Sequence, residues 1–184
     1  MTITLIRHGR PLADFSTKRR GDALGEWLRV YEGVTVDTSL PPPEALRVAL
    51  RGTRVFSSPV PRARSSAALL SAEMEMLDDA REAPLPERVW CPLRVRPATL
   101  LALARTAWFL GAAAGERPAA VRVRARRMAE VLLDAAREMG EAGAVALVGH
   151  GYMNRFIATE LRGLGWRRTA MDGMGYWGAM RFEK

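Results

Sequence analysis

His8 and His150 are the two histidines of the sequence, and each is followed directly by a glycine. A neutral imidazole can act as a nucleophile or donate a hydrogen bond. Glycine allows a sharp turn of the backbone and a close approach of a ligand. One histidine in this setting is more often structural than catalytic, but two in the same setting point to a shared site.

Two arginines accompany these histidines in the sequence. Arg7 directly precedes His8, and Arg62 follows the segment Ser57-Ser58-Pro59-Val60-Pro61. The planar guanidinium group presents donors that match the oxygens of a phosphoryl group, on which negative charge gathers during transfer. Together with the histidines, the arginines predict a phosphate site. Taken alone, Arg62 would more often be an arginine on a helix surface.

The pattern of apolar residues predicts the elements that position these side chains. Strands are expected at 2–6, 54–58, 144–148 and 175–182, and helices at 43–50, 61–70, 118–140 and 151–161. Strands that alternate with helices predict an α/β fold, a three-layer α/β/α sandwich with a mainly parallel central sheet. Ligands of such sheets bind beyond the carboxyl ends of the strands. The first three strands end next to His8, Pro59 and His150, so we expect these ends to form the site.

Three blocks of the sequence, at 5–9, 57–63 and 148–151, resemble in order and spacing the histidine phosphatase superfamily, which is also called phosphoglycerate mutase-like. The resemblance implies the phosphoglycerate mutase-like fold. It also implies that His8 is the nucleophile that forms a phosphohistidine, and that Arg7 and Arg62 bind the phosphoryl oxygens.

The resemblance implies further site residues. His150 donates to the same oxygens, and Gly151 lies against the substrate. No metal and no cofactor is expected. A carboxylic acid protonates the leaving oxygen, and the segment Arg81-Glu82-Ala83-Pro84-Leu85 makes Glu82 the first choice, with Glu87 in reserve. Gly115-Glu116 resembles another family signature, and Glu116 could equally be a site residue or a partner of the dipole at the start of the following helix.

The length of 184 residues fits one domain spanning 1–184, in which 84–115 is expected to form a cap over the site. A helix is expected at 97–115, and Arg105 at its middle argues against a membrane span. Trp90 and Trp108 make this cap apolar, which suggests a preference for phosphate esters with a hydrophobic part.

The formal net charge of +8 leaves room for an anionic partner. The basic residues are spread along the chain, which favours a small phosphorylated substrate over nucleic acid. One cysteine, Cys91, argues against a disulfide framework, so a cytoplasmic protein without membrane attachment is expected. The oligomeric state stays open.

The expected function is that of a metal-independent phosphatase acting on phosphomonoesters. Two alternatives remain. A phosphoglycerate mutase-type transferase would use the same chemistry but retain the phosphoryl donor, and the short chain favours hydrolysis. A non-catalytic, arginine-rich protein that binds anions or nucleic acid would keep the fold without turnover.

Overall fold

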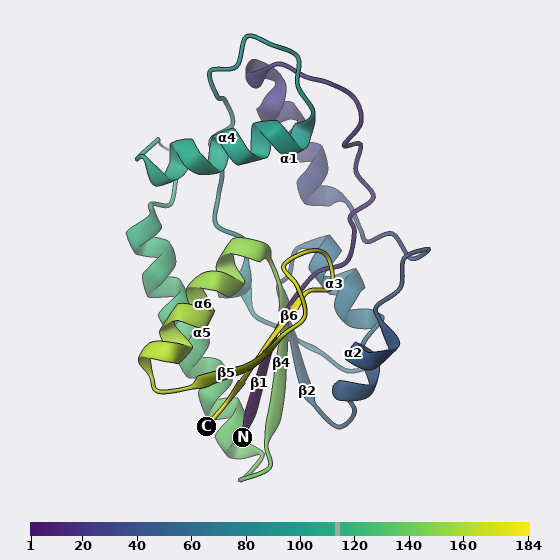
Figure 1. The fold of residues 1–184 in the computed structure, drawn as a ribbon, viewed down its shortest axis with the longest axis vertical. Coiled ribbons are helices and arrows are strands. Elements are labelled where there is room, and N and C mark those ends of the chain that lie inside the picture. The colour runs from purple at the N-terminus through teal and green to yellow at the C-terminus, as the bar shows by residue number, and fades with distance from the viewer. Residues whose placement is uncertain (113–114) are drawn as a thin grey trace.

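The computed structural model describes residues 1–112 and 115–184 and contains a sheet of six strands (Figure 1). In sheet order the strands are β3 (Glu75–Met76), β2 (Arg54–Ser57), β4 (Ala144–Gly149), β1 (Thr2–Arg7), β6 (Ala179–Glu183) and β5 (Arg167–Met171). The first four pair in parallel, and β6 is antiparallel to both of its neighbours. The predicted mainly parallel sheet is confirmed.

Helices cover both faces of this sheet. One face carries α5 (Pro118–Glu138) and α6 (Gly151–Gly163), and the other carries α2 (Glu44–Ala49) and α3 (Pro61–Ala68) (Figure 1). The strands alternate between two cores accordingly: Ile3 and Leu5 pack with α5 and α6, whereas Ile6 packs on the side of α2 and α3. The three-layer sandwich is therefore confirmed, and these four helices agree with the predicted ranges to about two residues.

Two further helices lie together beyond the carboxyl ends of the parallel strands, at the top of Figure 1. They are α1 (Leu24–Gly33), preceded by the short 3-10 helix η1 (Gly21–Ala23), and α4 (Pro97–Phe109). Leu24 and Trp27 of α1 pack against Leu100 and Ala104 of α4 in a core of their own. The segment 84–115 predicted as a cap thus packs with an earlier part of the chain, and its residues 113 and 114 lie outside the described residues.

The expected strand at 175–182 is wrong at its beginning. Strand β6 starts at Ala179, and Trp177 has a φ of 62°, a left-handed conformation that an extended strand cannot contain. The hairpin partner β5 was missed because all its residues are exposed and lack an apolar alternation. The loop between β5 and β6 folds back toward the carboxyl end of β1, where the backbone N–H of Trp177 donates to the carbonyl of Arg7 at 3.2 Å.

In the described part of the chain, no helix combines the length and the apolar character needed to cross a membrane.

Candidate active site

His8 and His150 lie side by side because their strands are neighbours. Arg7 at the end of β1 pairs with Gly149 at the end of β4, so the residues that follow leave the sheet at the same edge. The centroids of the two imidazole rings are 5.3 Å apart, and both side chains are almost completely buried, at 2% and 1% exposed. The sheet edge predicted to form the site does bring the two histidines together.

The tautomer of His8 follows from its hydrogen bond to the next residue. Its Nδ1 lies 2.7 Å from the carbonyl oxygen of Gly9, and because a carbonyl only accepts, Nδ1 carries the proton and donates. The lone pair is then on Nε2. Burial, with the nearby charges of Arg62 and Arg7, lowers the pKa of His8 to about 3 against the hydrogen bond to Gly9, which raises it. His8 is therefore a neutral ring with a free nucleophilic nitrogen at neutral pH.

Gly9 is required at its position by space, and its backbone holds the turn after His8 in place. A Cβ there would overlap the ring of Trp177 and a methyl group of Val36. The backbone N–H of Gly9 donates to the Ser66 hydroxyl at 2.9 Å, and that hydroxyl donates to the carbonyl of Arg62 at 2.6 Å. The turn after His8 is thus tied directly to α3, which carries Arg62.

Arg62 is positioned by the start of α3, where Pro61 occupies the first turn. Its guanidinium donates to the carbonyl of Tyr31 at 3.1 Å and to Oε1 of Glu32 at 3.3 Å, and lies over the Tyr31 ring at 4.3 Å. The side chain is 2% exposed, and its buried Nε has no hydrogen-bond partner.

Arg7 is held in a similar way by the loop between β5 and β6. Its Nη1 donates to the carbonyl of Met174 at 3.0 Å, and its guanidinium carbon lies 4.8 Å from the centre of the Tyr176 ring. The Nε of Arg7 is also buried without a partner. The same tyrosine ring lies 5.9 Å from the ring of His8.

One ring nitrogen of His150 has a hydrogen-bond partner, and the other has none. Its Nε2 lies 2.9 Å from the Ser58 hydroxyl, which also accepts a longer bond from the N–H of Val60 at 3.4 Å. Burial is the main cause that lowers the pKa of His150 well below its usual value, and the charge of Arg62 adds to it. When Ser58 donates its proton to Nε2, the buried and unpartnered Nδ1 carries the ring proton and can donate to a ligand.

Both lowered pKa values predict a specific loss of stability in acid. In the unfolded chain each imidazole ring has a pKa of about 6.5. Below that pH the unfolded state binds protons that the native state does not, so each ring lowers the free energy of unfolding by up to about 1.4 kcal/mol per pH unit. For His8 this loss continues as the pH falls toward the native pKa of about 3.

Urea denaturation at about pH 7.5 and about pH 5 measures this loss. We expect wild type to lose more free energy of unfolding than His8→Asn between these two values. NMR of the His8 ring at about pH 5 should show a neutral imidazole in the free protein. A ring that titrates near pH 6.5 would contradict the assignment of His8 as a buried neutral base.

The predicted site residues line one cavity of about 180 Å³. Its walls are Arg7, His8, Tyr31, Arg62, Glu82, Leu85, Leu101, Ala102, Arg105, His150, Gly151 and Tyr152. All six residues predicted from the sequence to act in the site are among them: Arg7, His8, Arg62, Glu82, His150 and Gly151. The cavity lies between the sheet edge and the cap, because Leu101, Ala102 and Arg105 belong to α4.

Glu82 reaches this cavity from the segment after η2 (Asp78–Ala80). Its Oε1 accepts the backbone N–H groups of Ala83 and Met153, both at 2.9 Å, and its Oε2 accepts that of Tyr152 at 3.1 Å. Two of these donors belong to the first turn of α6, directly after His150, where a carboxylate is favoured. The carboxyl group is therefore fixed beside the second histidine.

The other two glutamates lie outside the cavity that contains the histidines. Glu87 is exposed, lies 3.9 Å from the Arg29 guanidinium and lines an adjoining cavity of about 310 Å³. Glu116 binds the buried side chain of Arg124 at 2.7 Å. Glu116 does not line the cavity that contains the histidines, and its carboxylate forms a side-chain ion pair.

The idea that Trp90 and Trp108 shape substrate preference finds no support in the cavity. Trp90 is 91% exposed, whereas Trp108 is buried and donates through its indole N–H to the carbonyl of Glu116 at 2.9 Å. Neither residue lines the cavity, whose cap-side wall contains Leu101 and Arg105 instead.

Several residues of the site were not found from the sequence. Tyr31 comes from α1, a helix that the sequence analysis did not assign, and Tyr176 comes from the segment expected to be strand. Ser58 and Ser66 flank Arg62 in sequence, and a run of hydroxyl residues beside an arginine could have drawn attention to them. Arg105 was noted as an obstacle to membrane insertion and not as a wall of the site.

In the described part of the chain, no three His, Cys, Asp or Glu side chains are grouped so that they could hold a metal ion.

The chain resembles known proteins in sequence and in fold. The model of the histidine phosphatase superfamily (branch 1) matches residues 44–176, which includes Arg62, Glu82 and His150 but not Arg7 and His8. No curated protein matches the chain at a significant level.

Solved structures of similar fold cover almost the whole chain. A phosphoserine phosphatase of Entamoeba histolytica in complex with 3-phosphoglyceric acid has a TM-score of 0.61 at 18% identity, covering 99% of this chain and 90% of that one. A mycobacterial glucosyl-3-phosphoglycerate phosphatase in complex with VO3 has a TM-score of 0.63 at 19% identity, covering 98% and 91%. The protein called mycobacterial hydrolase 1 has a TM-score of 0.65 at 20% identity, covering 98% and 89%. The family model spans well over half of the sequence, and the chain therefore belongs to the histidine phosphatase superfamily (branch 1).

Proposed function

We propose that this protein hydrolyses small phosphomonoesters through a phosphohistidine at His8. The observation that carries the proposal is a set of four buried nitrogens without a partner on residues that line one cavity. One is Nε of Arg105 in the cap, and three belong to the residues predicted to bind the phosphoryl oxygens: Nε of Arg7, Nε of Arg62 and Nδ1 of His150. Buried donors are rarely left unpaired unless a ligand or water satisfies them. Three donors beside a free imidazole nitrogen suit the oxygens of a phosphoryl group.

The first half of the reaction forms the phosphohistidine. The lone pair on Nε2 of His8 attacks phosphorus, the bond from phosphorus to the ester oxygen breaks, and the electron pair goes to that oxygen. Positive charge then develops on the imidazole, and the Gly9 carbonyl that accepts from Nδ1 at 2.7 Å stabilises it. Glu82, protonated when the substrate binds, gives its proton to the leaving oxygen, and the three backbone N–H groups around its carboxyl group then stabilise the carboxylate that remains.

The second half restores the enzyme. Water attacks phosphorus and gives a proton to the Glu82 carboxylate, the bond from Nε2 to phosphorus breaks, and inorganic phosphate forms. During both halves Arg7, Arg62 and His150 donate to the non-bridging oxygens, so their contribution is greatest where negative charge is greatest.

Space for the leaving alcohol adjoins the phosphoryl site. A cavity of about 310 Å³ between α1 and the residues around Glu82 shares Arg62, Glu82, Tyr31 and Leu85 with the cavity that contains the histidines. Similar solved structures are described with 3-phosphoglyceric acid and with VO3, which supports a small phosphorylated substrate here.

An assay of the purified protein tests the proposal. We expect release of phosphate from p-nitrophenyl phosphate and from members of a panel of phosphorylated metabolites, at rates that a chelator does not change. A requirement for a bisphosphate and transfer to a phosphoglycerate acceptor would favour the mutase alternative. No turnover, with oligonucleotide binding that weakens steeply with salt and persists in His8→Ala, would favour the binding protein.

A further inference from the structure

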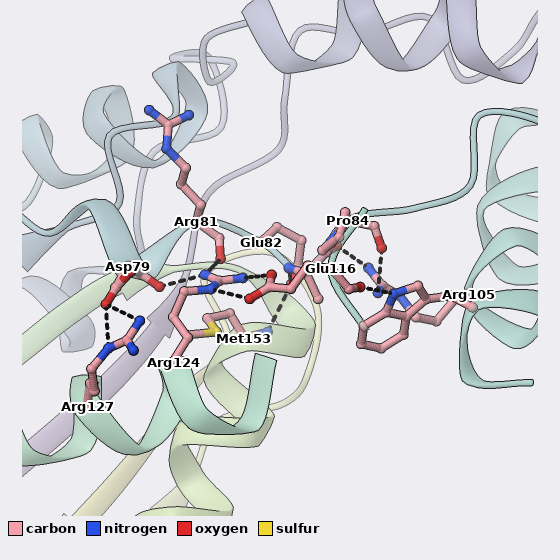
Figure 2. Close-up of polar contacts among 11 residues, drawn as sticks. Asp79, Arg81, Glu82, Pro84, Arg105, Glu116, Arg124, Arg127 and Met153 are labelled. Atoms are coloured by element: carbon pink, nitrogen blue, oxygen red, sulfur yellow. Dashed lines mark hydrogen bonds and ion pairs between the residues drawn. The ribbon is translucent and has the colours of Figure 1, made fainter. Parts of the chain in front are cut away.

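We propose that two arginines, Arg105 and Arg124, are positioning residues that hold the backbone on both sides of Glu82 and so fix its carboxyl group in the site. Figure 2 shows the two guanidinium groups approaching this segment from different helices. The inference rests on the proposed function, in which Glu82 protonates the leaving oxygen.

Arg124 of α5 binds the backbone before Glu82. Its Nη1 donates to the carbonyl oxygens of Asp79 and Arg81, both at 2.6 Å. Its remaining donors are oriented by Glu116, with Nε to Oε1 at 3.0 Å and Nη2 to Oε2 at 2.7 Å. A bidentate pair of this kind fixes the plane of the guanidinium group, so Nη1 is aimed at the two carbonyls.

Arg105 of α4 binds the backbone after Glu82. Its Nη2 donates to the carbonyl of Ala83 at 2.8 Å and its Nη1 to that of Pro84 at 3.2 Å. The four carbonyls of residues 79, 81, 83 and 84 therefore all accept from these two arginines. Residues 81–84 belong to no helix or strand, so no hydrogen bonds of secondary structure fix their backbone. The bonds from Arg105 and Arg124 fix it instead.

Arg105 also contacts a residue that binds the carboxyl group itself. Its guanidinium carbon lies 4.3 Å from the centre of the Tyr152 ring and 4.8 Å from that of Trp108, between residues of α6 and α4. The backbone N–H of Tyr152 donates to Oε2 of Glu82. One buried guanidinium thus links the cap to the Glu82 segment and to the start of α6.

The cost of burying Arg105 points to a role beyond packing. The side chain is 5% exposed and its guanidinium donates to two backbone carbonyls, although desolvation of a charge is unfavourable. Burial accordingly lowers the pKa of Arg105, against the nearby charge of Glu82, which raises it. A proton donor must lie within hydrogen-bond reach of the leaving oxygen, and a misplacement of about 1 Å can cost on the order of 100-fold in rate.

The test compares two substrates that differ in their need for a proton. The p-nitrophenolate group leaves readily without protonation, whereas the alkoxide of glycerol 2-phosphate requires it. We expect Arg105→Met to lower kcat/KM for glycerol 2-phosphate by about 10- to 100-fold and that for p-nitrophenyl phosphate by less than about 3-fold. Arg124→Met should show the same selectivity, and Arg105→Lys should restore part of the lost rate.

Two further variants make the comparison decisive. Glu82→Gln removes the proposed proton donor itself, so its loss of kcat/KM for glycerol 2-phosphate is the largest that the arginine variants can reach by misplacing Glu82. Arg127→Met is the matched control, because this exposed guanidinium binds the Asp79 side chain at 2.9 Å and no carbonyl of the segment, and we expect both rates to stay unchanged. Thermal denaturation and circular dichroism check that each variant is folded. If Arg105→Met does not fold, the kcat/KM values of Arg105→Lys on the two esters are compared instead.

Each outcome decides the proposal. The positioning role is overturned if the arginine variants lose kcat/KM equally on both esters. It is also overturned if neither arginine variant loses kcat/KM. If Glu82→Gln is selective but the arginine variants are not, the proposed function stands and this inference alone fails. If wild type hydrolyses neither ester, both fail. If Glu82→Gln shows no selectivity, hydrolysis through His8 stands, but the role of Glu82 as proton donor and this inference fail, because there is then no proton donor at Glu82 to position.

Discussion

Replacing His8 with alanine should lower kcat for phosphate esters by about 10⁴-fold or more, because the variant lacks the nucleophile and leaves the rest of the site in place. Nε2 of His8 is the neutral nitrogen that the hydrogen bond to Gly9 leaves free. Initial rates of wild type and variant with one aryl and one alkyl phosphate measure the effect. The loss should appear on both esters, in contrast to the selective loss expected for Glu82→Gln.

Trapping the intermediate provides the second measurement for His8. Wild type mixed rapidly with labelled substrate and denatured in alkali should retain label on the chain, and the variant should not. The variant should still bind vanadate, since Arg7, Arg62 and His150 keep their three unpartnered donors. Turnover near the wild-type value in His8→Ala would exclude the proposed nucleophile.

Replacing His150 with alanine should lower kcat by about 10²- to 10³-fold, the usual cost of removing one donor to the charge that develops in the transition state. The Nδ1 of this ring is buried, unpartnered and on the same cavity as His8. Steady-state kinetics distinguish stabilisation of the transition state from binding of the substrate in its ground state. A rise in KM at unchanged kcat would show that the ring binds the ground state and transition state equally, contrary to this prediction.

Ser58→Ala should lower kcat for the same reason as His150→Ala, but by less. The Ser58 hydroxyl lies 2.9 Å from Nε2 of His150, and by donating to that nitrogen it would favour the tautomer in which Nδ1 donates. Loss of one neutral hydrogen bond is worth about 1 kcal/mol, so we expect a fall in kcat of about 5-fold, well short of that in His150→Ala. An effect as large as that of His150→Ala would mean that Ser58 acts on the substrate directly.

The positions of the two histidines could be predicted because the relevant signals are local. An apolar run that stops at a histidine and a glycine marks the end of a strand, and parallel strands end at a common edge. Strands β1 and β4 behave in this way, and their register places Arg7 opposite Gly149. Pro61 at the start of α3 is likewise a local signal, and it placed Arg62 correctly at the beginning of a helix.

The supporting residues could not be predicted in the same way. Tyr31 reaches the cavity because α1 packs against α4, across a sequence separation that no local pattern reports. Tyr176 lies beside His8 because the glycine-rich loop before β6 folds back, with Trp177 in a left-handed conformation. The predicted strand at 175–182 missed this, since alternating residue types alone do not reveal where a chain turns.

By itself, the sequence determined which groups are available for chemistry: two imidazoles and two guanidiniums of the right type, at strand ends and at a helix start that local patterns predict. The tertiary structure decided their states. The lowered pKa values of His8 and His150 and the three unpartnered donors arise from burial and from charges on segments far apart in the chain. The support of Glu82 by Arg105 and Arg124 has the same origin, because hydrogen bonds and desolvation depend on distances that exist only once the cap, α5 and the sheet have packed.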